Sequence, residues 1–271
     1  MSDAGARPPH AVVLRAPSRF DVRLVAAALA KRSTLPAETW LPVVRRSWGI
    51  VAEPSPAEEA ESLAAELTAS GQPAVAVPVG LLEPVTVPVA VTKAELSGDG
   101  FDILAGRAGV EVQRLVWTHM KVLSAGAVSE TSRKTVTEGP SAGEKAVRLG
   151  ATLVTGLPLM GGKSKSRQVS EERRIPFIEM IFLEPALHIR ILASEFDYTA
   201  LGTKMSYSAE LNFRALVAEL AACAPGALRG KGARAILAKA PSGELSYESF
   251  EDVSNEQRWL LTLAVLGAAQ P

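Results

Sequence analysis

The apolar positions near the start of the chain change from the period of a strand to the period of a helix. Residues 10–16 form a short apolar run with β-branched side chains, which predicts a strand. In the following segment, 19–32, apolar residues recur three and four positions apart, which predicts an amphipathic helix. This spacing places Leu24 and Ala28 on the face that is turned inward.

A third helix, downstream of a short helix expected over 36–44, has the strongest boundary signals in the chain. Ser55 and Glu58 stand three positions apart, as a reciprocal capping pair requires, and Pro56 takes the first helical position. Gly71 suits the left-handed residue that ends a helix. These signals predict a capped helix between Ser55 and Gly71.

The elements together predict a small module with the order β-α-α-β-α-β over residues 10–79, after a flexible start over 1–9. Its second and third strands are expected at 48–54 and 72–78, which are short and apolar.

From residue 80 onward the pattern changes to strand-like pieces that are separated by glycine and proline turns, one of them at Glu184-Pro185. A helix over 208–223 closes this region, so we expect a strand-rich domain over 80–228, of pleckstrin-homology-like type in one interpretation. A tail over 229–271 contains a last helix, with Ser254 and Gln257 at capping spacing. The fold class predicted for the whole chain is α+β.

Two polar stretches, 129–150 and 161–174, interrupt the strands and are expected to be loops, since they have little periodic apolar content. The second is rich in basic residues that could converge on a phosphate or a lipid headgroup. These anion-binding candidates are Lys163, Lys165, Arg167, Arg173 and Arg174.

The sequence Gly-Gly-Lys-Ser in this stretch imitates a phosphate-binding loop of nucleotide-binding proteins. Such a loop needs a glycine five residues before Gly162, but Leu157 stands there and Gly156 is one position out of register. The polar residues after Lys163 also lack the apolar stripe of the required helix. A basic loop is therefore the preferred interpretation, and no cofactor is expected.

His188 is the candidate for acid-base chemistry, because strand alternation places it with Arg190 opposite an apolar face. Glu184 and Asp197 are the carboxylates considered as its partners, with Glu195 as a further neighbour. The alternative, which is more common for a strand histidine, is a surface or hydrogen-bonded structural role.

The amino-acid composition limits which classes of function and partner remain. The 29 basic and 29 acidic residues cancel, so net charge favours neither nucleic acid nor an anionic membrane as a partner. With 47% hydrophobic residues the chain can bury a sizeable core. Three widely spaced histidines and one cysteine, Cys223, predict no metal site and no internal disulfide, and a cytoplasmic location is the default expectation.

The helix and strand in SPAEEAESLAAELTASGQPAVAVP, with the elements before them, resemble the C-terminal domain of the bacterial ribosomal stalk protein. In that family a capped acidic helix of the pattern D/E-x-A-x-x-L-x-x-x-L also ends in a glycine and a short final strand. The segment is similar in the same way to the Clp protease adaptor family. The resemblance covers residues 10–79 and implies a module that serves as a platform for binding proteins.

The functional residues of both families are not matched. Where the stalk domain has a glycine and lysines that meet translation factors, this chain has Pro36, Glu38 and Leu41. The Asn-Asp and the pocket histidine of the adaptor family would fall near 15–17 and 45–48, where neither is present. The resemblance thus implies neither the stalk role nor the degradation role.

We therefore expect a non-enzymatic protein-binding or regulatory component whose partner is a protein of unknown identity. Its contact surface is expected on the basic side of the module, where the first fifty residues carry eight Arg or Lys against three acids. The surface residues are Arg19, Arg23, Arg45, Arg46 and Trp48. The alternatives are a peripheral anion- or lipid-headgroup-binding protein and an enzyme of unknown reaction around His188.

Overall fold

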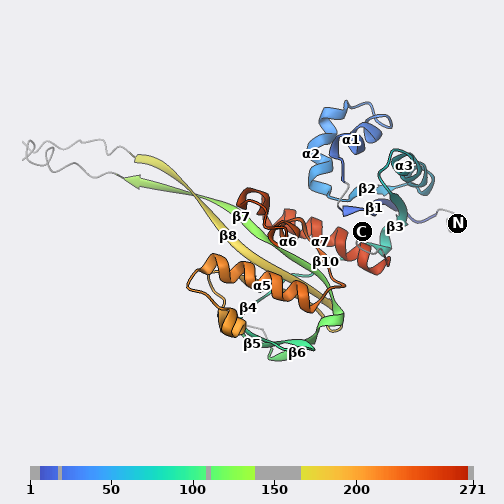
Figure 1. Ribbon diagram of the computed structural model, residues 1–271. Coiled ribbons are helices and arrows are strands. Elements are labelled where there is room, and N and C mark those ends of the chain that lie inside the picture. Colours follow the sequence, from blue (N-terminus) through green and yellow to red (C-terminus); the bar gives the residue numbers. More distant parts are fainter. Residues whose placement is uncertain (1–6, 18–19, 108–110, 138–165, 268–271) are drawn as a thin grey trace, which may run out of the picture. The chain divides into compact units, whose positions relative to one another are not determined.

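The computed structural model describes residues 7–17, 20–107, 111–137 and 166–267 (Figure 1). The chain divides into two compact units, Met1–Val128 with Ile175–Pro271 and, separately, Ser129–Arg174. Helices and sheets are both present, which confirms the α+β class.

The N-terminal part of the first unit has the predicted order β-α-α-β-α-β. Its elements are β1 (His10–Leu14), α1 (Val22–Ala30), α2 (Ala37–Ser47), β2 (Ile50–Ser55), α3 (Ala57–Ala69) and β3 (Ala74–Pro78). The three strands form an antiparallel sheet in the order β2-β1-β3. We call these elements the N-terminal module.

The buried face of α1 includes the predicted Ala28 and extends beyond it. The helix begins after Asp21, whose carboxylate accepts hydrogen bonds from the backbone N–H groups of Arg23 and Leu24. Leu24 is half-buried and packs against the core, and the buried residues are Val25, Ala26, Ala28 and Leu29. The face is wider than the periodicity suggested because α1 packs against both α2 and α3.

The predicted cap of α3 is wrong. Ser55 belongs to β2, where it pairs with His10, and Pro56 is the N-cap residue without a side-chain hydrogen bond. Ser55 therefore pairs within the sheet, although its spacing from Glu58 predicts a helix cap. Gly71 has a φ of 82°, as expected for the residue that ends this helix.

The rest of the first unit contains an eight-stranded sheet in the order β10-β7-β8-β9-β4-β5-β6, with β11 paired to β7. The strands are β4 (Val89–Leu96), β5 (Gly100–Gly106), β6 (Gln113–Val116), β7 (Met120–Thr137), β8 (Ser166–Leu183), β9 (Ala186–Leu192), β10 (Leu228–Arg229) and β11 (Ser246–Tyr247). The helices are α5 (Ala209–Cys223), α6 (Lys231–Leu237) and α7 (Phe250–Val265). Short 3-10 helices are η2 (Val79–Leu81), η3 (Trp117–His119), η4 (Tyr198–Lys204) and η5 (Ser242–Leu245).

Parts of both predicted loops are strand. Residues 129–137 continue β7 and residues 166–174 continue β8, and these two strands are neighbours in the sheet. Apolar periodicity could not reveal them, because a strand that continues a paired neighbour gains backbone hydrogen bonds whatever its side chains are. Residues 138–165, which include the Gly-Gly-Lys-Ser sequence, lie outside the described part of the chain.

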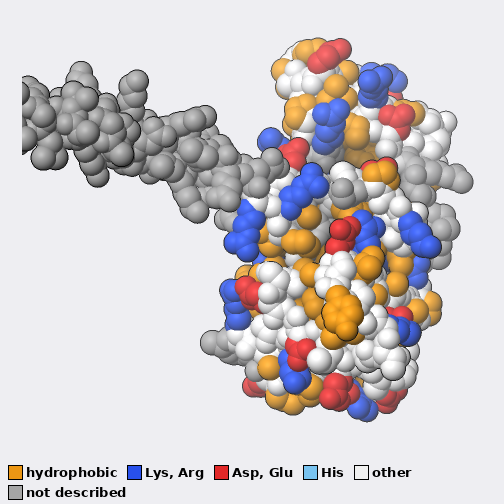
Figure 2. Space-filling model, turned by 60° about the vertical axis from the view of Figure 1, so that its left-hand side comes forward, with side chains coloured by type: hydrophobic (Ala, Val, Ile, Leu, Met, Phe, Trp, Pro, Cys, Tyr) orange, Lys and Arg blue, Asp and Glu red, His pale blue; other side chains and the backbone are white. Residues whose placement is uncertain are grey.

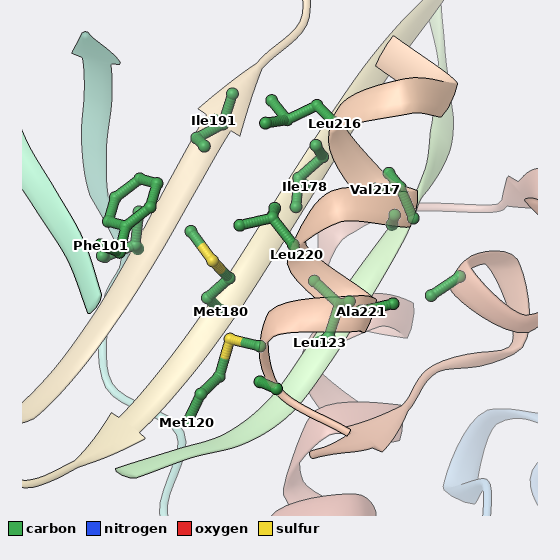
Figure 3. Packing of buried hydrophobic residues seen from close by; sticks show 14 of the residues in the cluster. Phe101, Met120, Leu123, Ile178, Met180, Ile191, Leu216, Val217, Leu220 and Ala221 are labelled. Atoms are coloured by element: carbon green, nitrogen blue, oxygen red, sulfur yellow. The ribbon is translucent and has the colours of Figure 1, made fainter. Parts of the chain in front are cut away.

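One face of the sheet is covered by α5 (Figure 3). The helix starts after Ser208, whose hydroxyl accepts a hydrogen bond from the N–H of Leu211, so the predicted helix is confirmed. Its buried side chains contact apolar residues that alternate along the central strands. The labelled residues of this cluster include Leu216, Val217 and Leu220 from α5, Met120 and Leu123 from β7, Ile178 and Met180 from β8, and Ile191 from β9.

The last helix, α7, joins the N-terminal module and the eight-stranded sheet in one apolar core. Trp259 of α7 is 1% exposed, and its Nε1 donates a 2.7 Å hydrogen bond to the carbonyl oxygen of Leu14 in β1. The same core includes Val122 of β7 and Ile181 of β8. The module therefore completes its core with a helix from the other end of the chain.

The predicted cap of this last helix lies five residues too late. Ser249 is the N-cap residue and accepts a hydrogen bond from the N–H of Asp252, whereas the Ser254 hydroxyl donates to the carbonyl of Phe250 inside the helix. The acidic residues Glu251 and Asp252 suit the first turn, where the helix dipole favours negative charge. No helix in the described part of the chain combines the length and the apolar character that crossing a bilayer requires.

Candidate functional site

A groove of about 510 Å³ lies along β2 in the N-terminal module and is lined by all six residues of that strand. The strand is at the edge of the three-stranded sheet, with β1 as its neighbour. The other lining residues come from four helices and the turn after α1. They are Leu29 of α1, Arg32 and Ser33 of the turn, Trp40, Val43, Arg46 and Ser47 of α2, Glu59 and Leu63 of α3, and Asn255 and Arg258 of α7.

The helix α2 supplies one wall of this groove. The helix carries Pro42 in its interior and turns Val43 outward, and that residue is 49% exposed. Trp40 is half-buried, and its Nε1 donates a 3.0 Å hydrogen bond to the Ser33 hydroxyl. An aromatic ring and an aliphatic side chain thus face the groove from α2.

Most charges at the groove are neutralised within the chain. Arg258 donates two hydrogen bonds to the Glu53 carboxylate, at 2.8 and 2.7 Å. Arg32 lies 2.9 Å from Glu66, and the hydrogen bond from Lys31 to Glu66 contributes most to lowering the pKa of that carboxyl. Figure 2 likewise shows Lys and Arg side chains interspersed with Asp and Glu on the face that it presents.

Two charged side chains of the groove make no ion pair with any described residue, Arg46 and Glu59. Both are exposed. Arg46 stands four positions before the start of β2, and Glu59 stands four positions after its end. Chain connectivity therefore favours a place near the start of β2 for the unpaired positive charge and a place near its end for the unpaired negative charge.

The predicted contact residues fall in different places. Arg46 lines the groove, while Arg23 and Arg45 are exposed and do not line it. Arg19 lies outside the described residues. Sequence reasoning missed Trp40, Val43 and the edge of β2, because a cavity depends on how α2 packs and not on the pattern of any one segment.

Trp48, the other predicted contact residue, is engaged inside the chain. Its Nε1 donates a 2.8 Å hydrogen bond to Asp252 Oδ1 of α7, and its ring centroid lies 6.0 Å from that of Tyr247. The Lys231 ammonium lies 5.0 Å from the Trp48 ring centroid. The backbone of Trp48 has a φ of 52°, a strained conformation for a non-glycine residue that these contacts hold in place.

The predicted anion-binding residues do not form a described cluster. Lys163 and Lys165 lie outside the described residues, and only the strand backbone of Arg167 is described. Arg173 and Arg174 are both exposed in β8. Because successive strand residues point to opposite faces, Arg173 and Arg174 present separate positive charges and not a single cluster.

His188 lies in a buried polar cluster on β8, β9 and α7. Its Nε2 is 3.0 Å from Glu179 Oε2, and its Nδ1 is 2.7 Å from the carbonyl oxygen of Thr86. The Glu179 carboxylate also accepts hydrogen bonds from Arg190 Nε and, at 2.5 Å, from Gln257 Nε2. Glu179 is fully buried and His188 is 2% exposed. We call these residues the Glu179 cluster.

The predicted partners of His188 are wrong. Glu184 lies near His119, with 3.7 Å between Glu184 Oε2 and His119 Nε2, and Asp197 lies 3.5 Å from the Lys93 ammonium. The register of the hairpin explains the error, because it pairs Ile181 with His188 and brings Glu179 across from Arg190.

Burial alone would raise the pKa of Glu179, because a dry interior disfavours a charge. The hydrogen bond from His188, the charges of His188 and Arg190 and the hydrogen bond from Gln257 outweigh burial and hold that pKa below its ordinary value. The cluster therefore keeps an ionised carboxylate in the core.

A second buried carboxyl, Glu256, precedes Gln257 on α7. Its Oε2 accepts a 2.6 Å hydrogen bond from the Tyr247 hydroxyl, and its Oε1 accepts a 2.6 Å bond from the N–H of Lys231. Burial is the largest influence and raises the pKa of Glu256. The sequence carried a signal for both residues, because Glu256 and Gln257 continue the buried stripe of Val253 and Leu260.

Among the described residues, no group of three or more His, Cys, Asp or Glu side chains is arranged to hold a metal ion. Comparisons of this chain with protein-family models, with curated proteins and with solved structures found no match.

Proposed function

We propose that this chain is a cytoplasmic, non-enzymatic protein-binding or regulatory component, adaptor-like in character, that contacts a protein partner through the groove along β2. The observation that carries this proposal is the groove itself, which Trp40, Val43 and Arg46 line beside an edge strand. Tryptophan and arginine are enriched among residues that dominate binding energies at protein interfaces. Leu35, 48% exposed just before α2, donates its backbone N–H to the hydroxyl of Ser33, a residue that lines the groove.

The state of the Glu179 cluster supports a role without catalysis. A catalytic histidine has to reach a substrate, whereas His188 is almost fully buried and its two ring nitrogens lie within hydrogen-bond distance of Glu179 and Thr86. The groove, in contrast, carries the exposed side chains of Val43, Arg46 and Glu59. The exposed side chains are therefore better suited to binding a partner than to catalysing a reaction.

The test is capture of a partner from the source cell with the full chain and three variants. Val43→Asp and Arg46→Glu change exposed groove side chains, and Arg15→Glu changes an exposed arginine of the same module that does not line the groove. We expect a protein that is captured by the unaltered chain and by Arg15→Glu, and that is lost with both groove variants. Equal capture by all four chains would refute the proposal, as would the absence of any captured protein.

A contact with phosphate or a lipid headgroup is the second candidate, favoured by the exposure of Arg173 and Arg174 on β8. Sedimentation with vesicles that contain an anionic lipid tests it. The expected result is binding that falls when Arg173 and Arg174 become Ala, and no binding of the unaltered chain would refute it.

A further inference from the structure

We propose that the occupant of the groove is an extended peptide segment of the partner, which adds to β2 as a fourth strand and carries an acidic residue at one end and a basic residue at the other. This inference rests on the proposed protein-binding function and specifies the form and the charge of what is bound.

The position of β2 supports strand addition. In the order β2-β1-β3 the strand has a neighbour on one side only among the described residues. An edge strand presents a row of backbone N–H and C=O groups that another chain can pair with. All six residues of β2 line the groove, so the cavity follows the strand along its whole length. At about 3.3 Å per residue this length is roughly 20 Å, enough for an extended peptide of about six residues.

The sequence of β2 limits which part can pair. Pro54 has no backbone N–H and cannot donate a hydrogen bond to an added strand. Pairing therefore centres on residues 50–53, with Ser55 beyond the proline. Proline is a common device for blunting an edge strand, and here it leaves a short stretch open and so favours a short peptide over continued sheet growth.

The walls of the groove define the side chains that fit. Val43 and Trp40 of α2 offer apolar contact to one face of an added strand. Because strand side chains alternate, the peptide would present apolar residues at every second position toward α2. The volume of about 510 Å³ is in the range of pockets that hold bound ligands.

The two unpaired charges set the polarity of the occupant. Arg46 lies before the start of β2 and Glu59 after its end, while Arg258 and Arg32 are engaged by Glu53 and Glu66. An acidic residue of the peptide matches Arg46, and a basic residue matches Glu59. Complementary charges at both ends also fix the register in which the peptide pairs.

The experiment uses the full chain and a displayed library of random linear decapeptides. We expect enriched peptides to have apolar residues at alternate positions between one acidic and one basic residue. Replacing backbone N–H groups of an enriched peptide by N-methyl, one at a time, should weaken binding on the order of tenfold at alternate positions and little between them.

Charge reversal gives the second readout. With Arg46→Glu the preference at the acidic position should change to a basic residue, and with Glu59→Lys the basic position should change to an acidic one. Arg15→Glu is the control and should leave the selected motif unchanged. Circular dichroism of each variant checks that the fold is kept, which we expect because these side chains are exposed.

Three outcomes overturn the inference: no enriched peptide, N-methyl effects without a period of two, or a motif unaffected by Arg46→Glu and Glu59→Lys. If the partner protein is still lost with Val43→Asp in the capture experiment, these outcomes leave the proposed function standing and reject only the extended acidic-basic segment. If capture is insensitive to the groove variants, the proposed function itself fails.

Discussion

The groove along β2 and the Glu179 cluster use the same kinds of side chain in opposite states. In the Glu179 cluster, an arginine, a histidine and a glutamine all reach one carboxylate, and the carboxylate is fully buried. In the groove, Arg46 and Glu59 are exposed and make no ion pair with a described residue. Charges that satisfy one another in a dry core define the fold, whereas charges left open at a cavity are available to a partner.

The helix α7 contributes to both regions, which makes the comparison testable within one element. Gln257 reaches into the Glu179 cluster, and Arg258, the next residue, lines the groove and pairs with Glu53. Variants on the two sides should therefore separate stability from binding.

The largest expected effect is on the buried side. Replacing Glu179 by Ala leaves Arg190 and His188 without their carboxylate, so the free energy of unfolding should fall by about 3–5 kcal/mol. Urea unfolding measures this loss. Glu184→Ala is the matched control, because that side chain is 79% exposed and its removal should change stability by less than about 0.5 kcal/mol. Equal effects of the two variants would contradict a structural role for the Glu179 cluster.

Neighbouring parts of the core should respond to pH with opposite sign. The pKa of Glu179 is lowered in the folded state, so its stabilisation is present above the ordinary pKa of 4.5 and is lost as the pH falls through the folded pKa. The pKa of Glu256 is raised, so the stability it confers declines as the pH rises from 4.5 through the folded pKa.

Unfolding free energies of Glu179→Gln and Glu256→Gln across this pH range check these signs. Relative to the unaltered chain, Glu179→Gln should lose less stability on acidification, and Glu256→Gln should lose less as the pH rises above 4.5. If the unfolding free energy changes with pH in the same way for both variants, the pKa values of the two carboxyls are not shifted in opposite directions.

A smaller effect is expected at the contact between the N-terminal module and α7. Trp48→Phe removes the hydrogen bond to Asp252 while keeping an aromatic ring, and should cost about 1 kcal/mol of unfolding free energy. Trp40→Phe removes a hydrogen bond to Ser33 at the exposed groove and should cost less. Thermal or urea unfolding ranks the stability losses of the two variants. A larger loss for Trp40→Phe than for Trp48→Phe would indicate that Trp48 lies at an open surface.

The smallest effect on stability is expected at Arg46. Arg46→Ala should change the unfolding free energy by less than about 0.5 kcal/mol, because the side chain is exposed and without an ion-pair partner among the described residues. Its binding of an enriched peptide should nevertheless fall, as a binding assay at low and high salt can measure. A stability loss comparable to that of Glu179→Ala would remove the distinction between the two regions.

Sequence pattern predicted the order of elements in the N-terminal module because each strand and helix there has its own period. It placed the caps of α3 and α7 wrongly, since Ser55 is used by the sheet and Ser249 provides the earlier cap. The partner of His188 was within reach of the sequence. A hairpin turn at Glu184-Pro185 sets the register that brings Glu179 opposite Arg190, but counting neighbours along the chain favoured Glu184 instead.

The groove itself could not be predicted from the chain pattern. The groove forms only because α2 and α7 lie around the same strand edge, although they are more than two hundred residues apart in the sequence. The hydrogen bond from Asn255 to the Arg46 carbonyl is one contact between them. Of the groove residues, the sequence pattern indicates only Arg46, as part of the basic surface of the module.

Amide hydrogen exchange of the full chain, with and without an enriched decapeptide, tests the central claim most directly. If the peptide adds to β2, exchange should slow at outward-facing amides within residues 50–53 and stay unchanged in β3, the opposite edge of the same sheet. Slowing in β3 with none in β2, or no slowing in the N-terminal module while the peptide is bound, would contradict the account.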